Sequence, residues 1–536
     1  MKLHNPPLEQ LAEAWTLSCT GRPQVARVIA EKARQTALAD GNVQALALAN
    51  EHLAWFCLMQ SRLEDGLRYA TLAVSLWAGL SDRAHEAVSR GTLAWLMCEA
   101  GDEEAIVEAQ YAVALAEQTD DVAARASVQN ALCVVLWMLQ QHDLSRSAGM
   151  EAVALARQTR DPLAIGRWLL NAALPEEGLA ELAAQRGDRD AERAYCDRSI
   201  DLTREAAVTC ASCGDTWAAC IALCNLVEWL IRGGRLAEAR SALEEARLLP
   251  GEATDSRKIV ILHMNGLLAS AEGNRQDAVP LLQNALNVAI TTNDLSICVQ
   301  IARELSALLE TCGRFQEALQ RYQQFFCLYT RRSAERSQAR ARMLSMQQEL
   351  CELQTRVAQF ERLAGEDALT GLANRRQLDL LLAERCQRGR GYGLAIVDVD
   401  HFKSVNDKLT HLVGDEVLRA VSALLASVTR PDDCIGRFGG EEFLLITPES
   451  SALDGPVICE MLRASVADAD WAYIDPRLNV TVSIGYASGS EGRNHEEVMN
   501  LADRRLYEAK RLGRNRIVAN GDNNTEMLSI NMPIKR

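Results

Sequence analysis

The sequence predicts a multidomain protein that begins with an all-α solenoid, continues through a coiled-coil helix and ends in an α+β domain. Three observations predict this order: turn motifs recur about every 40 residues, a heptad stripe follows them, and the last part alternates apolar strands with helices. A chain of 536 residues is too long for one hydrophobic core. We therefore expect domains at 1–330, 331–366 and 367–520, followed by a flexible tail at 521–536.

Residues 1–330 are rich in Ala, Leu, Glu and Arg, which favours helices. Polar turn motifs recur there at intervals of 39 to 47 residues, beginning at Ser61, Gly101, Gln141, Gly187, Gly234, Gly273 and Gly313. This is the period of stacked helical hairpins. The hairpins resemble degenerate tetratricopeptide repeats (TPR-like) that lack the full signature of that family. We expect their concave surface to bind an unknown protein, peptide or small ligand. The alternative is a scaffold that only positions the next domain.

A heptad stripe follows the repeats and is flanked by Arg, Gln and Glu. Steps of four and three residues separate Ala339, Met343, Met346, Leu350, Leu353, Val357, Phe360 and Ala364. Such spacing is typical of a coiled-coil seam, and a parallel dimer is the preferred interpretation. The alternative is that this helix packs on the solenoid and covers its end.

Clustered carboxylates mark the expected site of chemistry. An apolar strand at 392–399 ends in Asp398 and Asp400, and a pair of glycines precedes Glu441 and Glu442. A carboxylate at the end of a buried strand needs a cation or a hydrogen-bond partner, and Mg²⁺ suits oxygen ligands shared with a nucleotide triphosphate. Asp398 and Asp400 would share one face if the strand persists, whereas Glu441 and Glu442 would point to opposite faces. One member of each pair would then bind metal while the other has a different role.

Further elements complete an alternating α+β pattern. We expect helices ending near 387, beginning near 414 and containing 507–516, and strands at 434–438, 444–447 and 479–487. Lys510 and Arg514, four residues apart on one helical face, would clamp phosphates, although such a pair alone is also typical of a solvated basic face.

Several motifs together resemble the diguanylate cyclase (GGDEF) family over residues 367–518. They are Asp367-Ala-Leu-Thr-Gly-Leu-Ala-Asn-Arg-Arg376, the block from Asp398 to Asp415, and Gly439-Gly440-Glu441-Glu442-Phe443. The resemblance implies a palm-like antiparallel sheet with flanking helices, related to nucleotide cyclases. It also implies that two GTP molecules are condensed into cyclic di-GMP, with two Mg²⁺ per active site or Mn²⁺ in their place.

The resemblance also assigns roles to residues. The metal ligands would be Asp398, the carbonyl of Val399 and Glu441; the catalytic residues Glu442 and Lys403; the GTP-binding residues Phe402, Asn406, His411, Asp415, Gly440, Lys510 and Arg514; and the inhibitory product site Arg430 and Asp433. Asp415 can accept hydrogen bonds from the N1–H and amine of guanine, whereas adenine would leave this carboxylate unpaired. Glu442 would either assist deprotonation of the attacking hydroxyl or have a structural or metal-relay role.

Each GGDEF domain holds one GTP, so the reaction requires a homodimer. The family usually has Gly-His where this chain has Thr410-His411, which puts the local loop geometry in doubt because Gly often adopts a positive φ. The alternative function is a catalytically silent nucleotide receptor or scaffold that signals through the repeats. Silent relatives typically lose the Gly-Gly-[Asp/Glu]-Glu signature, which is intact here.

Composition limits the remaining possibilities. The formal net charge of −15 argues against binding to nucleic acid or anionic membranes. No apolar run is long enough for a targeting segment or membrane span, so we expect a cytoplasmic protein. The 16 cysteines lack paired CxxC spacing and should mostly be small buried apolar residues rather than disulfides or zinc ligands.

Overall fold

The computed structural model describes residues 6–20, 22–250, 254–387, 391–448 and 454–519, so the expected tail at 521–536 lies outside the described residues. The chain divides into two compact units, Met1–Leu350 and Cys351–Arg536. No helix among the described residues combines the length and apolarity needed to cross a bilayer. Every cysteine whose side chain the structure describes is a free thiol.

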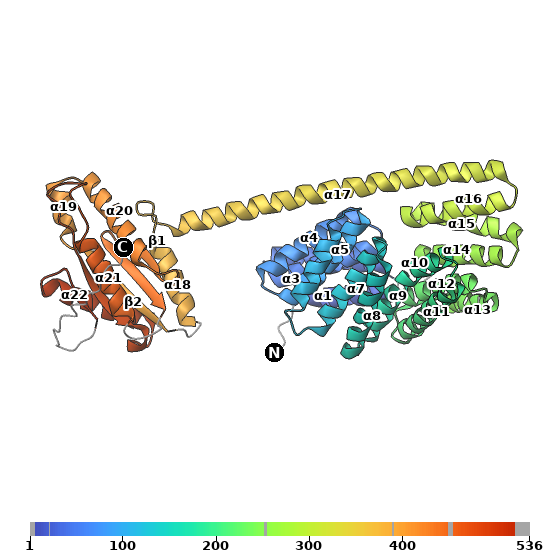
Figure 1. Ribbon diagram of the computed structural model, residues 1–536, viewed down its shortest axis with the longest axis horizontal. Helices are drawn as coiled ribbons and strands as arrows, with labels where there is room; N and C mark the ends of the chain where they lie inside the picture. Colours follow the sequence, from blue (N-terminus) through green and yellow to red (C-terminus); the bar gives the residue numbers. More distant parts are fainter. Residues whose placement is uncertain (1–5, 21, 251–253, 388–390, 449–453, 520–536) are drawn as a thin grey trace. The chain divides into compact units, whose positions relative to one another are not determined.

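The first unit is an array of antiparallel helices, as predicted (Figure 1). The helices are α1 (Pro6–Cys19), α2 (Pro23–Ala39), α3 (Val43–Met59), α4 (Leu63–Gly79), α5 (Arg83–Glu99), α6 (Ala105–Ala116), α7 (Val122–Met138), α8 (His142–Thr159), α9 (Pro162–Ala172), α10 (Leu174–Gln185), α11 (Arg189–Ser212), α12 (Thr216–Arg232), α13 (Leu236–Leu248), α14 (Asp255–Ala271), α15 (Arg275–Thr292), α16 (Leu295–Thr311) and α17 (Phe315–Gly365).

The predicted turn motifs all fall between helices of this array. Many helices also begin with an aspartate whose carboxylate accepts a hydrogen bond from a first-turn N–H, as Asp82 does in α5 and Asp215 in α12. Small residues near the start of the second helix of a hairpin, such as Ala239 and Ala278, are completely buried. Their size allows the two helices of each hairpin to pack closely.

The heptad stripe lies on α17, which continues without a break through the expected boundary at 330. Ala339 and Met343 are buried in the hydrophobic cluster of the first hairpins, with 3% and 2% of their surfaces exposed. Met346 and Leu350 are half-buried, whereas Leu353 is exposed. The side chains at 357 and 360 lie outside the described residues. The start of the stripe therefore packs on the repeats, as the second interpretation of this helix required.

Ion pairs accompany this packing, because the helix carries arginines beside its buried stripe. The pairs join Arg336 to Glu99 (2.8 Å), Arg340 to Asp102 (3.2 Å) and Arg342 to Glu64. The three acidic partners belong to α4, to α5 and to the turn after α5, so α17 docks on the second and third hairpins (Figure 1).

The second unit is an α+β domain built on a six-stranded sheet in the order β1-β3-β4-β2-β5-β6. The four inner strands pair antiparallel as predicted, and the two-residue edge strands pair parallel with their neighbours. The elements are β1 (Ala373–Asn374), α18 (Arg375–Gln387), β2 (Tyr392–Val399), α19 (Phe402–Lys408), α20 (His411–Val428), β3 (Cys434–Arg437), β4 (Glu442–Pro448), α21 (Asp454–Ala467), β5 (Val482–Ser488), the 3₁₀ turn η1 (Gly489–Glu491), α22 (His495–Arg511) and β6 (Ile517–Val518).

Helices cover both faces of the sheet, and β2 lies near its centre (Figure 1). Ala395 and Val397 of β2 pack with α20 and α21, while Leu394 and Ile396 pack with α18 and α22. Because side chains alternate along a strand, Asp398 points to the same face as Leu394 and Ile396. The buried strand therefore delivers a carboxylate to the side that α22 covers.

Candidate active site

Two neighbouring strands bring three of the expected metal-binding residues to one end of the sheet. Asp398 of β2 lies directly opposite Glu442 of β4 in the antiparallel register. The N–H of Val399 donates to the carbonyl oxygen of Glu441 at 3.2 Å. Asp398, Val399 and Glu441 are thus adjacent, although the first two are 40 or more residues from the third in sequence.

The carboxylates of this cluster are held where negative charge is unfavourable. Only 5% of Asp398 is exposed, and burial raises the pKa of its carboxyl, although Lys510 opposes the shift with its Nζ at 2.8 Å. Burial also raises the pKa of Glu441, and repulsion from Asp398 adds to the increase. A cation near both carboxylates would relieve this excess of negative charge.

The donor set suits a hard cation that keeps part of its own coordination shell. Among the described residues no group of three or more His, Cys, Asp or Glu side chains could hold a metal ion. Two carboxylates and a backbone carbonyl leave positions open for water and phosphate oxygens, which is how Mg²⁺ is commonly bound. The residues present therefore fit the expected divalent cation.

Asp400 has a different environment from Asp398. Its carboxylate accepts hydrogen bonds from the hydroxyls of Thr481 (2.7 Å) and Ser483 (2.6 Å) and from the N–H of Asn515 (3.0 Å). A buried carboxylate with three such donors is stabilised without a metal. Asp400 thus joins the end of β2 to β5 and to the turn after α22, whereas Asp398 pairs with Lys510.

Arg437 holds the Gly-Gly turn in place, and sequence reasoning gave it no role. Its Nε and Nη2 donate to the carbonyl oxygen of Gly440 at 3.1 and 2.8 Å, and its Nη1 contacts Asp367 at 3.2 Å. The N–H groups of Phe438 and Gly439 both donate to the carbonyl oxygen of Glu442. The only signal for this clamp in the sequence was the position of a basic residue, Arg437, two residues before the Gly-Gly pair.

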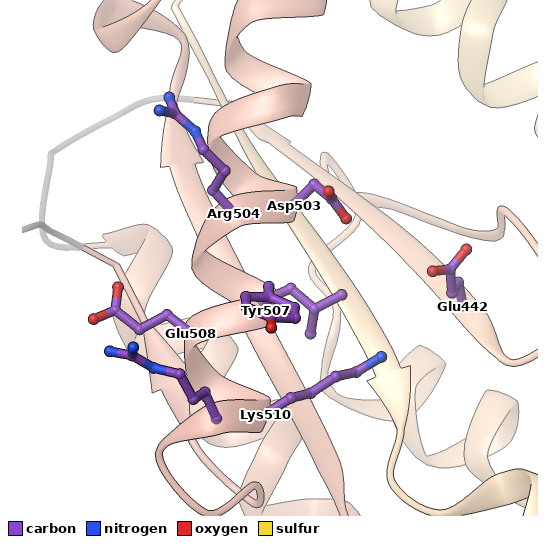
Figure 2. A pocket seen from close by; sticks show the side chains of 8 residues that line it. Glu442, Asp503, Arg504, Tyr507, Glu508 and Lys510 are labelled. Carbon is purple, nitrogen blue, oxygen red and sulfur yellow. The ribbon is translucent and has the colours of Figure 1, made fainter.

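An open hollow of about 540 Å³ lies between β4 and α22. Figure 2 shows Glu442 on the strand side, with Asp503 and Tyr507 on the helix. Lys510 extends from α22 toward the strands, whereas Glu508 lies on the other side of the helix. Glu442 and Lys510 therefore border a space beside the carboxylate cluster that is large enough for part of a nucleotide.

The loop after β2 gathers other expected substrate residues. His401 has φ +59° and begins a turn into α19, where Phe402 is buried and Lys403 is exposed. Asn406 lies against Gly414, because a methyl group on Gly414 would overlap its Oδ1. Asp415 follows Gly414 directly, so the two residues expected to bind guanine belong to the adjoining helices α19 and α20.

Thr410 occupies its position without backbone strain. Its φ of −164° is extended, and its hydroxyl accepts a hydrogen bond from the N–H of Val413 as the N-cap of α20. The helix consequently begins at His411, which is exposed, rather than near Gly414 as predicted.

The prediction that Lys510 and Arg514 share one helical face is wrong. Helix α22 ends at Arg511, and Arg514 lies in the following turn with φ +63°. Its Nε is 4.0 Å from a carboxylate oxygen of Asp400, whereas Lys510 pairs with Asp398. The two cations thus approach the end of β2 from different elements, because the left-handed turn redirects the chain.

Arg430 and Asp433 form a turn before β3. The carboxylate of Asp433 accepts a hydrogen bond from the backbone N–H of Arg430 at 2.8 Å, and Arg430 itself is exposed. Asp433 therefore fixes this turn through the backbone of Arg430.

Comparisons with known proteins include the unit that carries this site. The family model described as "Diguanylate cyclase, GGDEF domain" matches residues 364–516. Diguanylate cyclase DgcP of Pseudomonas aeruginosa is 32% identical over 246 residues, which cover 45% of this chain and 36% of the relative. Response regulator PleD of Caulobacter vibrioides is 41% identical over 163 residues, which cover 29% of this chain and 36% of the relative.

Solved structures match the same part of the chain. The GGDEF domain of DgcB from Caulobacter crescentus, in complex with c-di-GMP, is 37% identical, covers 29% of this chain and 95% of that chain, and has a TM-score of 0.28. The chain spans about a third of the length of the two relatives named above. The family match covers the carboxylate cluster, the Gly-Gly turn and Lys510.

Proposed function

We propose that this chain, whose residues 364–516 form a GGDEF domain, is a diguanylate cyclase that condenses two GTP molecules into cyclic di-GMP and two pyrophosphates. One observation carries the proposal: the complete Gly439–Glu442 turn holds Glu441 beside Asp398 at the end of the central strands. The curated relatives named diguanylate cyclases support it.

Asp398, Glu441 and the carbonyl oxygen of Val399 would hold Mg²⁺, or Mn²⁺ in its place. The fit comes from two carboxylates of raised pKa, of which Asp398 pairs with Lys510. When bound, the cations supply charge stabilisation to the phosphate that is transferred. Lys510 would then be available to contact phosphate oxygens, because the cations would neutralise Asp398, with which Lys510 now pairs.

Base selection rests on Asn406 and Asp415. Asp415 would accept from the N1–H and exocyclic amine of guanine, and Asn406, whose Oδ1 lies against Gly414, would bind the remaining edge. The phosphates would be bound by the loop of Phe402 and Lys403, by the backbone of Gly440, and by Lys510 and Arg514, with His411 on the substrate side.

The reaction is attack of the 3′-hydroxyl of one GTP on the α-phosphate of the other. Glu442 borders the hollow in Figure 2 and is a candidate to accept the hydroxyl proton, although a structural role fits its position opposite Asp398 as well. Each domain binds one GTP, so two domains must face each other and the active form is a homodimer.

Helix α17 would connect the repeats to this dimer. Ala339 and Met343 cannot line a coiled-coil seam while they pack on the first hairpins, whereas Leu353 is exposed and available to a partner helix. Docking of α17 would therefore limit how far the seam extends, and a signal received by the repeats would act by changing that extent.

Product binding would add a second control. The turn at Arg430 presents an exposed guanidinium that can bind guanine or phosphate of cyclic di-GMP, while Asp433 fixes the turn. This site is outside the carboxylate cluster, so occupancy there would inhibit without competing for the metal ligands.

Incubation of the purified full-length chain with GTP and Mg²⁺, followed by nucleotide separation, tests the proposal. Cyclic di-GMP should form, and Glu441→Ala should reduce its formation by at least about 100-fold because a metal ligand is lost. Glu496→Ala, an exposed glutamate at the start of α22, is the matched control and should retain activity. Absence of product at every protein concentration, with GTP still bound, would instead identify a catalytically silent receptor.

A further inference from the structure

The last hairpin of the repeat unit ends with an apolar face that remains exposed. Helix α17 is the second helix of that hairpin: Ala318 is buried against α15 and α16, and the hydroxyl of Ser306 on α16 donates to its carbonyl oxygen at 2.9 Å. In earlier hairpins the second helix also packs on the first helix of the next hairpin, as α13 does on α14 and α15 on α16. Since α17 is the last helix of the unit, no hairpin follows it in the part of the unit that the structure describes.

Five large apolar side chains form this exposed face at the start of α17. Alternating steps of four and three residues separate them, and their exposed fractions range from 47% to 69%. They are Phe315, Leu319, Tyr322, Phe326 and Tyr329, which we call the aromatic stripe. Such steps place side chains along one side of a helix, as in the seam between two packed helices.

The aromatic stripe is distinct from the heptad stripe farther along α17. Phe326 and Met343 are 17 residues apart, and a helix of 3.6 residues per turn directs their side chains about 100° away from each other. Met343 is buried on the repeats, whereas 60% of Phe326 is exposed. A partner on the aromatic stripe would therefore lie on a different side of α17 from the heptad stripe.

The half-buried Phe325 supports the aromatic stripe from the side of α16. It packs against the hydrophobic cluster of α15 and α16, and its ring centroid is 5.6 Å from that of Tyr322 and 6.0 Å from that of Tyr329. Side chains that are already ordered lose little conformational entropy when a partner covers them. The stripe is thus a preformed contact surface.

The area of the aromatic stripe is sufficient for a specific contact between two copies. Large aromatic side chains bury roughly 150–250 Å² each, so these exposed fractions correspond to about 600 Å² on one copy. An apolar patch of about 600 Å² is at the upper end of what a monomer exposes. Two copies would cover about 1,200 Å², which is the lower end of the range for specific interfaces.

The residues beside the stripe allow an identical helix to approach. Gln316, Gln323 and Thr330 flank the stripe on the side away from α16, and all three are exposed and uncharged. Charged residues at such flanking positions would set identical helices against like charges. Each copy also offers the spacing of apolar side chains that it requires from the other, as in a contact with twofold symmetry.

We propose that the aromatic stripe is an interface between two copies of this chain, in which the start of one α17 packs on the start of the other. Repeat arrays need a covered end, and here a helix of the second copy covers it. The proposal rests on the repeat unit and does not depend on the reaction of the GGDEF domain.

Sedimentation equilibrium of the full-length chain tests this interface. Leu353→Glu is present in every sample, because it disables the seam expected farther along the helix. We expect this chain to form dimers as its concentration rises from about 1 to 100 µM. Adding Phe326→Glu brings one carboxylate from each copy into the contact and should raise the dissociation constant at least about 100-fold. Monomers at every concentration, or equal dissociation constants with and without Phe326→Glu, would overturn the proposal.

Leu144→Glu on α8 is the matched control, since 59% of Leu144 is exposed and it lies outside the stripe. It should leave the dissociation constant unchanged, and an increase as large as that of Phe326→Glu would contradict the assignment. Circular dichroism checks folding, and Tyr322→Lys replaces Phe326→Glu if that variant is unfolded. The measurement needs no GTP, so an inactive GGDEF domain would leave its result unchanged.

Discussion

Replacing Met343 by alanine should loosen the middle of α17 from the repeats. Only 2% of Met343 is exposed, and its side chain packs in the cluster of the first hairpins. Burying a methionine contributes about 1.5–3 kcal/mol, so removing most of the side chain should cost docking about 2 kcal/mol. At about 1.4 kcal/mol per tenfold change, the undocked population rises roughly 30-fold.

Hydrogen exchange of backbone amides in 336–346 measures this population, because an undocked helix frays and exchanges. Leu344→Ala is the matched control: Leu344 is the neighbouring residue, 48% of it is exposed, and the change in helix propensity is similarly small. We expect faster exchange in the Met343 variant alone. Equal exchange rates in the two variants would refute the packing of α17 on the repeats.

Three other predictions concern the GGDEF domain. Burial and a neighbouring carboxylate raise the pKa of Glu441, so its ionisation lowers stability as pH rises through that pKa. Without divalent cations, Glu441→Gln should melt higher than wild type at pH 7.5 but not at pH 4, whereas Glu496→Gln should show no such difference. Arg437→Met, which loses two hydrogen bonds to Gly440, should lower turnover about 10-fold or more with GTP and Mg²⁺; unchanged turnover would remove Arg437 from the site. Arg430→Ala should shift inhibition by added cyclic di-GMP to higher concentration while the initial rate is retained, and superimposable inhibition curves would contradict the product site.

Sequence reasoning located the GGDEF domain well because its elements carry strong local signals. Strand β2 runs over the predicted residues, since a buried apolar run ends in a charged residue there. The predicted end of α22 was too late. Lys510 and Arg514 keep the four-residue spacing of a helical face, but the helix ends at Arg511 and Arg514 lies in the left-handed turn that follows. The clamp by Arg437 was missed for a different reason: its contact with Asp367 joins positions 70 residues apart, which spacing cannot reveal.

The repeats illustrate a related limit. Their period predicted the hairpins, because each turn has its own polar or glycine signal. The heptad stripe showed that one face of α17 must be covered but not by what, since a partner helix and a repeat surface both accept apolar side chains. Burial of Ala339 and Met343 resolves this for the start of the stripe.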